Sequence, residues 1–173
     1  MNSRGFLFLT FCLAGAISGC KRSERNPDVL HRDGDPDVIY VDSEDAEMNA
    51  AIAHAQSTKA EFLQTLQAAK PNQTDFSAKR PYLTNKGGTD REHIWVSNLS
   101  YDGKLLHGTI GDDPVNIPHL KLGDPVSFPP DELSDWMYLE DGKIVGGYTI
   151  RVLRKRMSPQ DATDFDQNMQ FKQ

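Results

Sequence analysis

Cysteine is nearly absent from this chain. The 173 residues contain two, Cys12 and Cys20, and none follows position 20. Beyond that position the chain cannot contain a disulfide, a cysteine nucleophile or a thiolate metal site. The G-x-S-x-G turn of many serine hydrolases and the zinc-protease helix motif are missing as well. A triad assembled from scattered residues stays open.

The chain also lacks an excess of positive charge and a long apolar run. Its 19 Lys and Arg stand against 25 Asp and Glu, for a net charge of −6. Such a chain is a poor general binder of nucleic acid and has no broad electrostatic attraction to anionic lipid. A membrane-spanning helix needs about 20 apolar residues, more than the run over residues 6–14 supplies. We therefore predict no nucleic-acid partner and no transmembrane helix.

The first twenty residues have the pattern of an export signal. Arg4 precedes the short apolar run, and the segment ends in Ile17-Ser18-Gly19-Cys20. This ending resembles the lipobox of bacterial lipoproteins, which implies lipid transfer to the Cys20 thiol, cleavage before Cys20 and acylation, for example with palmitate. Lys21 follows Cys20 at the position where an Asp would favour retention in the inner membrane. The absence of Asp resembles the pattern of lipoproteins that are sorted to the outer membrane, facing the periplasm, in a Gram-negative cell. Ordinary secretion with a chance cysteine is the alternative.

Removal of residues 1–19 from the 173 leaves 154, enough for one domain with a hydrophobic core. Arg4 is the one charged residue removed, so the net charge changes from −6 to −7. Residues 20–37 are charged and contain Pro and Gly, which predicts a flexible tether. The folded domain is predicted over 38–157, with a short strand at its start, and a short C-terminal helix or tail over 158–173.

The pattern after the tether predicts one long helix followed by strands. Apolar residues recur at spacings of three and four between Asp42 and Ala69, and Pro71 ends the helix. Two-residue hairpin turns are predicted at Asp102-Gly103 and Asp141-Gly142. Strands are predicted over residues 76–83, 92–99, 105–110, 126–128, 136–139 and 143–153.

Together these elements predict an α+β fold. A long N-terminal helix packs its stripe of Met48, Ile52, Phe62 and Leu66 on a curved antiparallel sheet of about five strands. Ser158 begins a short C-terminal helix, with Phe165 and Met169 among its apolar residues, that closes the sheet.

Five short motifs follow one another in the strand region. They are Phe76-Ser77-Ala78-Lys79, Glu92-His93-Ile94-Trp95-Val96, Gly123-Asp124-Pro125-Val126, Ser134-Asp135-Trp136-Met137 and Gly146-Gly147-Tyr148-Thr149. In this order they resemble the YegJ-like family of bacterial proteins, domain of unknown function 2314. The resemblance covers about residues 44–153. It implies a small α+β domain, often on a secreted or lipidated chain, and no established activity.

Glu92 and His93 are the most enzyme-like pair, because a carboxylate beside an imidazole can serve general acid–base chemistry. Adjacent strand residues point to opposite faces of a sheet, however. The alternative is therefore a polar strand start, and no catalytic residue is assigned.

The histidines invite a metal interpretation through His93, His107 and His119. A two-residue turn at Asp102-Gly103 places His107 opposite Asn98, which puts His93 and His107 on opposite faces of the sheet. We therefore predict no metal site and no cofactor. Solvent-exposed or hydrogen-bonded histidines are the default interpretation. His93 with Asp112 stays open as a pair, although two ligands do not make a metal site.

Four aromatic residues are candidates for a binding face: Trp95, Trp136, Tyr138 and Tyr148. Core packing of at least two of them is the competing interpretation. Asp135 is expected to accept backbone hydrogen bonds. Gly146-Gly147 predicts a bulge or a close backbone approach inside a strand and, because a strand follows, no phosphate loop. The basic residues between Arg151 and Arg156 are expected to be solvated, or else to contact lipid headgroups or an acidic partner.

The candidate binding residues are Glu92, His93, Trp95, Asp135, Trp136 and Tyr148. The functional hypothesis is a lipid-anchored cell-envelope protein whose sheet face and loops bind another macromolecule, with a protein of the envelope as the expected partner. It acts as an accessory protein or as an immunity-type protein that blocks a toxin. The alternative is an envelope enzyme acting on cell-wall or lipid material through Glu92 and His93.

Overall fold

The structure, a computed structural model, describes residues 10–14, 28–32, 35–86 and 90–171. Its elements in chain order are β1 (Thr10–Ala14), β2 (Asp28–Arg32), β3 (Asp35–Asp42), α1 (Ala46–Gln67), β4 (Gln73–Leu83), β5 (Arg91–Tyr101), β6 (Leu106–Ile110), β7 (Pro125–Phe128), a 3₁₀ turn (Pro130–Glu132), β8 (Asp135–Glu140), β9 (Lys143–Gly146), α2 (Tyr148–Arg156), α3 (Pro159–Asn168) and β10 (Gln170–Phe171).

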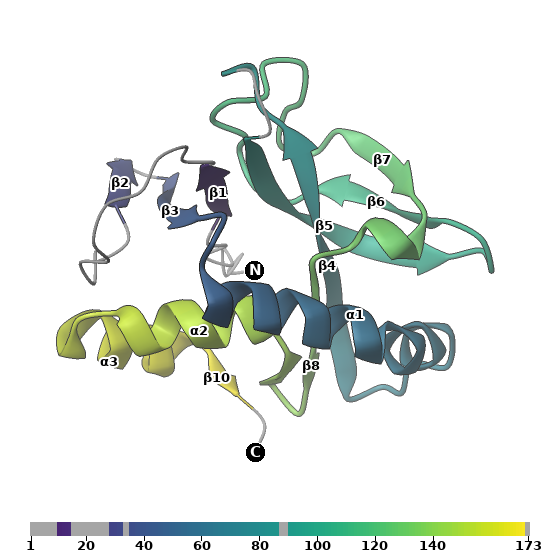
Figure 1. Ribbon diagram of the computed structural model, residues 1–173. Helices are drawn as coiled ribbons and strands as arrows, with labels where there is room; N and C mark the ends of the chain where they lie inside the picture. The colour runs from purple at the N-terminus through teal and green to yellow at the C-terminus, as the bar shows by residue number, and fades with distance from the viewer. Residues whose placement is uncertain (1–9, 15–27, 33–34, 87–89, 172–173) are drawn as a thin grey trace.

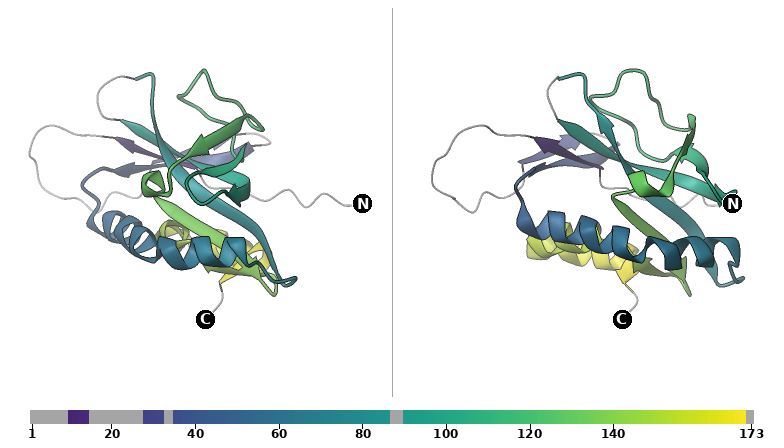
Figure 2. Two further views of the ribbon diagram at one scale, coloured as in Figure 1. Left: turned by 90° about the vertical axis from the view of Figure 1, so that its right-hand side faces the viewer. Right: turned by 45° about the vertical axis from the view of Figure 1, so that its right-hand side comes forward.

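The strands form one sheet in the order β10-β9-β8-β4-β5-β1-β3-β2, with β6 paired to β5 and β7 paired to β6. The three helices gather near the β8–β10 end, and β5, β6 and β7 curl away from them (Figures 1 and 2). The mixed α and β architecture is confirmed. The expectation of an antiparallel sheet of about five strands is wrong. Seven strands, β4–β10, follow α1, and two pairs, β1 with β3 and β9 with β10, are parallel. The two-residue β10 is too short to leave a sequence pattern.

Helix α1 starts later than the sequence predicts. Asp45, rather than Asp42 or Ser43, is its N-cap, and its Oδ1 accepts the Met48 N–H at 2.9 Å. The apolar stripe divides between two partners. Phe62 and Leu66 pack on the sheet, whereas Met48 and Ile52 pack on α2.

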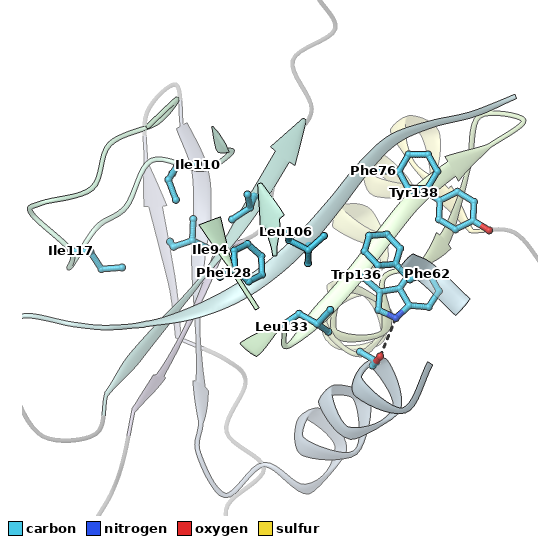
Figure 3. Packing of buried hydrophobic residues seen from close by; sticks show 13 residues of the cluster. Phe62, Phe76, Ile94, Leu106, Ile110, Ile117, Phe128, Leu133, Trp136 and Tyr138 are labelled. Atoms are coloured by element: carbon cyan, nitrogen blue, oxygen red, sulfur yellow. Dashed lines mark hydrogen bonds between the residues drawn. The ribbon is translucent and has the colours of Figure 1, made fainter. Parts of the chain in front are cut away.

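The sheet has a hydrophobic core on each face. Ile94 and Trp136 belong to the cluster that also contains Phe62 of α1, and in Figure 3 Trp136 lies beside the Phe62 ring while Ile94 lies beside Phe128. Their strand neighbours Trp95 and Met137 point to the other face of the sheet and pack under α2 and α3. The consecutive apolar residues of β5 are therefore explained by a strand covered on both faces.

One of the two predicted turns is confirmed. Glu140 pairs with Lys143 across Asp141-Gly142, and both turn residues have positive φ, 54° and 76°, as a type I′ hairpin requires.

The other predicted turn is wrong. Tyr101 pairs with Leu106, not with Lys104. The Asp102 carboxylate accepts the N–H groups of Lys104 and Leu105 and so stabilises a longer loop. Because of this loop and of a register shift between Ser97 and Ser100, His107 pairs with Ser100 and not with Asn98. The argument that placed His93 and His107 on opposite faces depended on the Asn98 pairing and is therefore invalid.

The predicted strand over residues 143–153 is half wrong. It ends at Gly146, and α2 follows at once. The predicted C-terminal helix is confirmed as α3, since Ser158 caps it and Phe165 is buried against the sheet.

Cys20 lies outside the described residues. β1 falls within the segment assigned to the signal peptide and pairs with β3 and β5. β2 and β3 form a hairpin where the sequence predicts mostly tether. The strand expected at residues 38–41 is part of β3. Within the described residues, no helix is long and apolar enough to cross a bilayer.

Candidate functional site

Polar side chains meet inside the molecule where β4, β5, β8 and α2 join. Lys79, Asp135 and Thr149 are fully buried. The Thr149 hydroxyl accepts from Lys79 Nζ at 3.2 Å and donates to Asp135 Oδ2 at 2.6 Å. Lys79 Nζ also lies 4.7 Å from the Trp95 ring centroid. We call these four residues the buried network.

Burial shifts both charged groups of the buried network. It lowers the pKa of Lys79 to about 8, against the opposing attraction of Asp135 and Asp112. Burial raises the pKa of Asp135, and the Lys79 ammonium partly offsets this. The two charges therefore stabilise each other where neither can reach water.

Asp135 acts as the N-terminal cap of α2 from a neighbouring strand. Its carboxylate accepts the N–H groups of Tyr148 and Thr149 at 3.1 and 2.8 Å, at the positive end of the helix dipole. The expected hydrogen bonds from backbone N–H groups to Asp135 are confirmed, but those from Tyr148 and Thr149 cap α2 rather than the turn before β8, where the sequence predicts the cap. Gly146-Gly147 does lead into a helix, contrary to the sequence-based argument against a phosphate loop. Asp135 already occupies the helix terminus that a phosphate would need.

Gly146 is confirmed as a point of close backbone approach. A Cβ atom there would lie 2.3 Å from the Trp136 carbonyl oxygen. Its φ of 79° also favours glycine.

Glu92 and His93 are both buried and both hold structural positions. The Glu92 carboxylate accepts the N–H groups of Val115 and Asn116, each at 2.8 Å, and so fixes the loop before β7. His93 Nδ1 lies 2.8 Å from Ser134 Oγ, and burial lowers the pKa of His93 to about 3. A neutral, enclosed imidazole and a carboxylate bound to backbone are poorly placed for acid–base chemistry.

The four candidate aromatic residues do not form one exposed face. Trp95 lies in the core under α2 and α3, and Trp136 and Tyr138 lie in the core under α1. Tyr148 is half-buried, with its ring edge against Trp136. Core packing is therefore confirmed for at least two of them.

The other two histidines of the metal interpretation lie apart from this region. His107 contacts Asp102 and Ser127, and His119 is exposed. Within the part of the chain that the structure describes, no three His, Cys, Asp or Glu side chains could share a metal ion.

An open cleft of about 370 Å³ lies where β4 and β5 separate. The two strands pair from Ala78 and Val96 onward, and their register in the described residues stops there. Ser77 and Ser97, the next residue on each strand beyond the Ala78–Val96 pair, face each other with their Oγ atoms 3.4 Å apart. We call this the fork cleft. Its lining is Asp75, Phe76, Ser77, Ser97, Asn98, Leu99 and Met137.

Both rims of the fork cleft carry a strained residue. Asp75 and Asn98 each have φ of 54°, a left-handed conformation that is uncommon outside glycine. Each lies at a register shift, one in the β4–β8 pairing and the other in the β5–β6 pairing. Bulges and strained residues of this kind concentrate at functional sites.

A family model described as "Uncharacterized protein conserved in bacteria (DUF2314)" matches residues 45–172. The chain belongs to this family. The DUF2314 match spans α1 to β10 and so contains the buried network and the fork cleft. It confirms the YegJ-like resemblance.

Two curated relatives fit this assignment. The chain is 33% identical over 103 residues to the uncharacterized protein YegJ of Escherichia coli, covering 60% of this chain and 64% of YegJ. It is 29% identical over 138 residues to a putative ankyrin repeat protein of Neisseria meningitidis, covering 77% of this chain and 54% of that protein. The chain thus spans between half and two thirds of the length of these relatives. No solved structure matches it.

Sequence reasoning missed the fork cleft and the role of Lys79 in this DUF2314 domain. Lys79 was part of a motif but had no assigned partner, because its contacts with Thr149 and Trp95 are distant in sequence. The polar pair Ser97-Asn98 inside an apolar strand was the available signal. Asn tolerates the left-handed conformation better than most residues, so a polar interruption containing it can mark a bulge.

Proposed function

We propose that this protein is a lipid-anchored cell-envelope protein that binds an extended segment of a partner protein in the fork cleft. The lipid is carried by Cys20, and the membrane is the outer one, facing the periplasm, if the cell is Gram-negative. Binding, rather than catalysis, is its biochemical role, in an accessory or an immunity-type setting.

The main support for this proposal is the pair of open strand edges, of β4 and β5, that border the fork cleft. β4 pairs with β8 on its outer side, and β5 pairs with β6 on its outer side. Among the residues that the structure describes, the edges facing the cleft have no pairing strand beyond Ala78 and Val96. Unpaired strand edges bind extended peptides through main-chain hydrogen bonds. The serines at the vertex and Asn98 and Asp75 at the rims add side-chain donors and acceptors.

Two further observations favour binding over an enzyme. The carboxylate and imidazole that an acid–base mechanism would use are buried and bound within the fold. The second is the cleft itself, whose lining of two serines, Asn98 and Asp75 offers hydrogen-bonding groups to a bound segment.

The anchor is tested by metabolic labelling with palmitate. The wild-type protein is expected to take up the label and to remain with the membrane fraction, and Cys20→Ser is expected to lose both. Labelling of the Cys20→Ser variant would contradict the anchor.

The cleft is tested with a variant that removes both rim side chains, Asp75→Gly with Asn98→Gly. Glycine accepts the left-handed conformation, so this variant should fold at least as stably while binding the partner about tenfold more weakly. Asp141→Gly is the matched control, because Asp141 has the same φ but lies in the β8–β9 turn.

A further inference from the structure

A second cleft lies where β9, α2, α3 and β10 meet. It has a volume of about 840 Å³, within the size range of small-molecule sites. Arg151, Lys143 and Phe171 contribute to its lining, together with one further arginine and three carboxylates. We call it the α2–β10 cleft.

The carboxylates of this cleft already have donor partners. Arg154 holds Asp166 with hydrogen bonds from Nε, at 2.6 Å, and from Nη2. The other two accept amide hydrogen bonds, from Gln73 to Glu140 at 2.8 Å and from Asn72 to Asp141 at 2.9 Å.

The other basic residues of α2 are paired too. Lys155 binds Glu47, and Arg156 binds Asp45 and Glu47. Among the residues whose side chains the structure describes, Arg151 and Lys143 have no carboxylate within ion-pair distance. The basic run that the sequence singles out is thus neutralised except at Arg151.

Arg151 is held in one orientation. Its Nε donates to the Gly146 carbonyl at 3.0 Å, and its guanidinium carbon lies 4.0 Å from the Phe171 ring centroid. The residue is half-buried, and this partial desolvation lowers the pKa of Arg151. The two terminal nitrogens of the guanidinium thus remain as donors, in the fork geometry that matches an oxyanion.

We propose that the α2–β10 cleft binds a phosphate group, with Arg151 as the bidentate donor and Lys143 as the second positive charge. A phosphate monoester carries a charge of about −1.5 to −2 at neutral pH. Arg151 supplies a fixed pair of donors for it, and Lys143 adds a second positive charge. Both act beside Glu140 and Asp141, which accept from neutral amides and keep their negative charge. The group comes from a free phosphorylated metabolite or from a phospholipid headgroup. This site does not depend on the fork cleft or on its partner.

The test uses the full-length protein in a neutral detergent, with NMR titrations that follow the Arg151 Nε–H and Gly147 amide signals. The probes are inorganic phosphate and a short-chain phosphatidate. Arg151→Gln should weaken binding about 10- to 100-fold, the value of a charge-assisted hydrogen bond. Lys155→Gln is the matched control on the same helix and should bind as the wild type does.

Lys143→Gln tests the same site if the Arg151→Gln variant does not fold. Lys143 is exposed at the start of β9, so this variant should fold normally and bind about 3- to 5-fold more weakly. Tighter binding of the phosphatidate than of phosphate, by about tenfold, supports the headgroup source, and equal affinities support a free phosphate compound. Signals that do not saturate with either probe, or equal affinities in the wild type and both site variants, would overturn the proposal.

Discussion

Burial decides what each polar side chain can do at the scale of single residues. The sequence places Glu92 and His93 side by side, which is typical of acid–base pairs. The structure encloses both and gives each a partner far along the chain, Asn116 for Glu92 and Ser134 for His93. Local sequence could not show this, because the partners are brought close only by folding.

His93 makes the protein sensitive to acid. Its pKa is about 3 in the folded protein and 6.5 ordinarily, so the unfolded chain binds more protons between these values. Stability is therefore lost as the pH falls from about 6.5 toward 3, by up to about 1.4 kcal/mol per pH unit. His93→Asn should show a shallower loss between pH 7.5 and 5, measured by urea unfolding.

His119→Asn is the control, because His119 is exposed. This variant should keep the wild-type pH dependence. An unchanged slope in His93→Asn would show that His93 is accessible to protons in the folded state.

At the scale of elements, a hydrogen-bonding cap from a distant strand decides the secondary structure of α2. The run Tyr148-Thr149-Ile150 is rich in residues that favour strands, which explains the erroneous strand prediction. It forms a helix because Asp135, from β8, binds the first N–H groups of α2. The C-terminal end of α1 and the strands β5–β8, by contrast, could be predicted closely, since their signals lie within each segment.

Asp135→Asn should destabilise the protein by about 3–5 kcal/mol, because it leaves Lys79 as a buried charge without its counter-ion. Lys79→Met combined with Asp135→Asn should be less destabilised than the sum of the single variants, by about 1–3 kcal/mol. Urea unfolding of the four proteins measures this coupling. Additive effects would contradict a coupled buried network.

The turn before α2 depends on Gly146. Gly146→Ala should destabilise by more than about 3 kcal/mol, because a left-handed conformation and a collision with Trp136 both oppose the new Cβ. Gly103→Ala is the comparison, since Gly103 also has positive φ but open space around its Cβ position. Its loss should be about 1 kcal/mol. Equal losses in thermal unfolding would show that the close approach is unimportant.

The N-terminal strands matter at the scale of the whole molecule. β1 joins the β2–β3 hairpin to β5 and lies in the segment that signal cleavage would remove. In the mature protein, amide hydrogen exchange in β2 and β3 should therefore be faster than in β4, β5 and β8. Equal protection would mean that the hairpin pairs directly with β5 and would contradict this expectation.

The central claim is that an anchored DUF2314 domain binds one partner protein through the fork cleft. The most direct measurement is a quantitative pull-down from envelope fractions with the lipidated protein, with Asp75→Gly/Asn98→Gly and with Asp141→Gly. We predict one stoichiometric partner that the wild type and Asp141→Gly retain, and that the double variant recovers in clearly smaller amount, as an affinity about tenfold weaker requires. Equal recovery of the same partner by all three proteins, or recovery of none by the wild type, would contradict binding through the fork cleft.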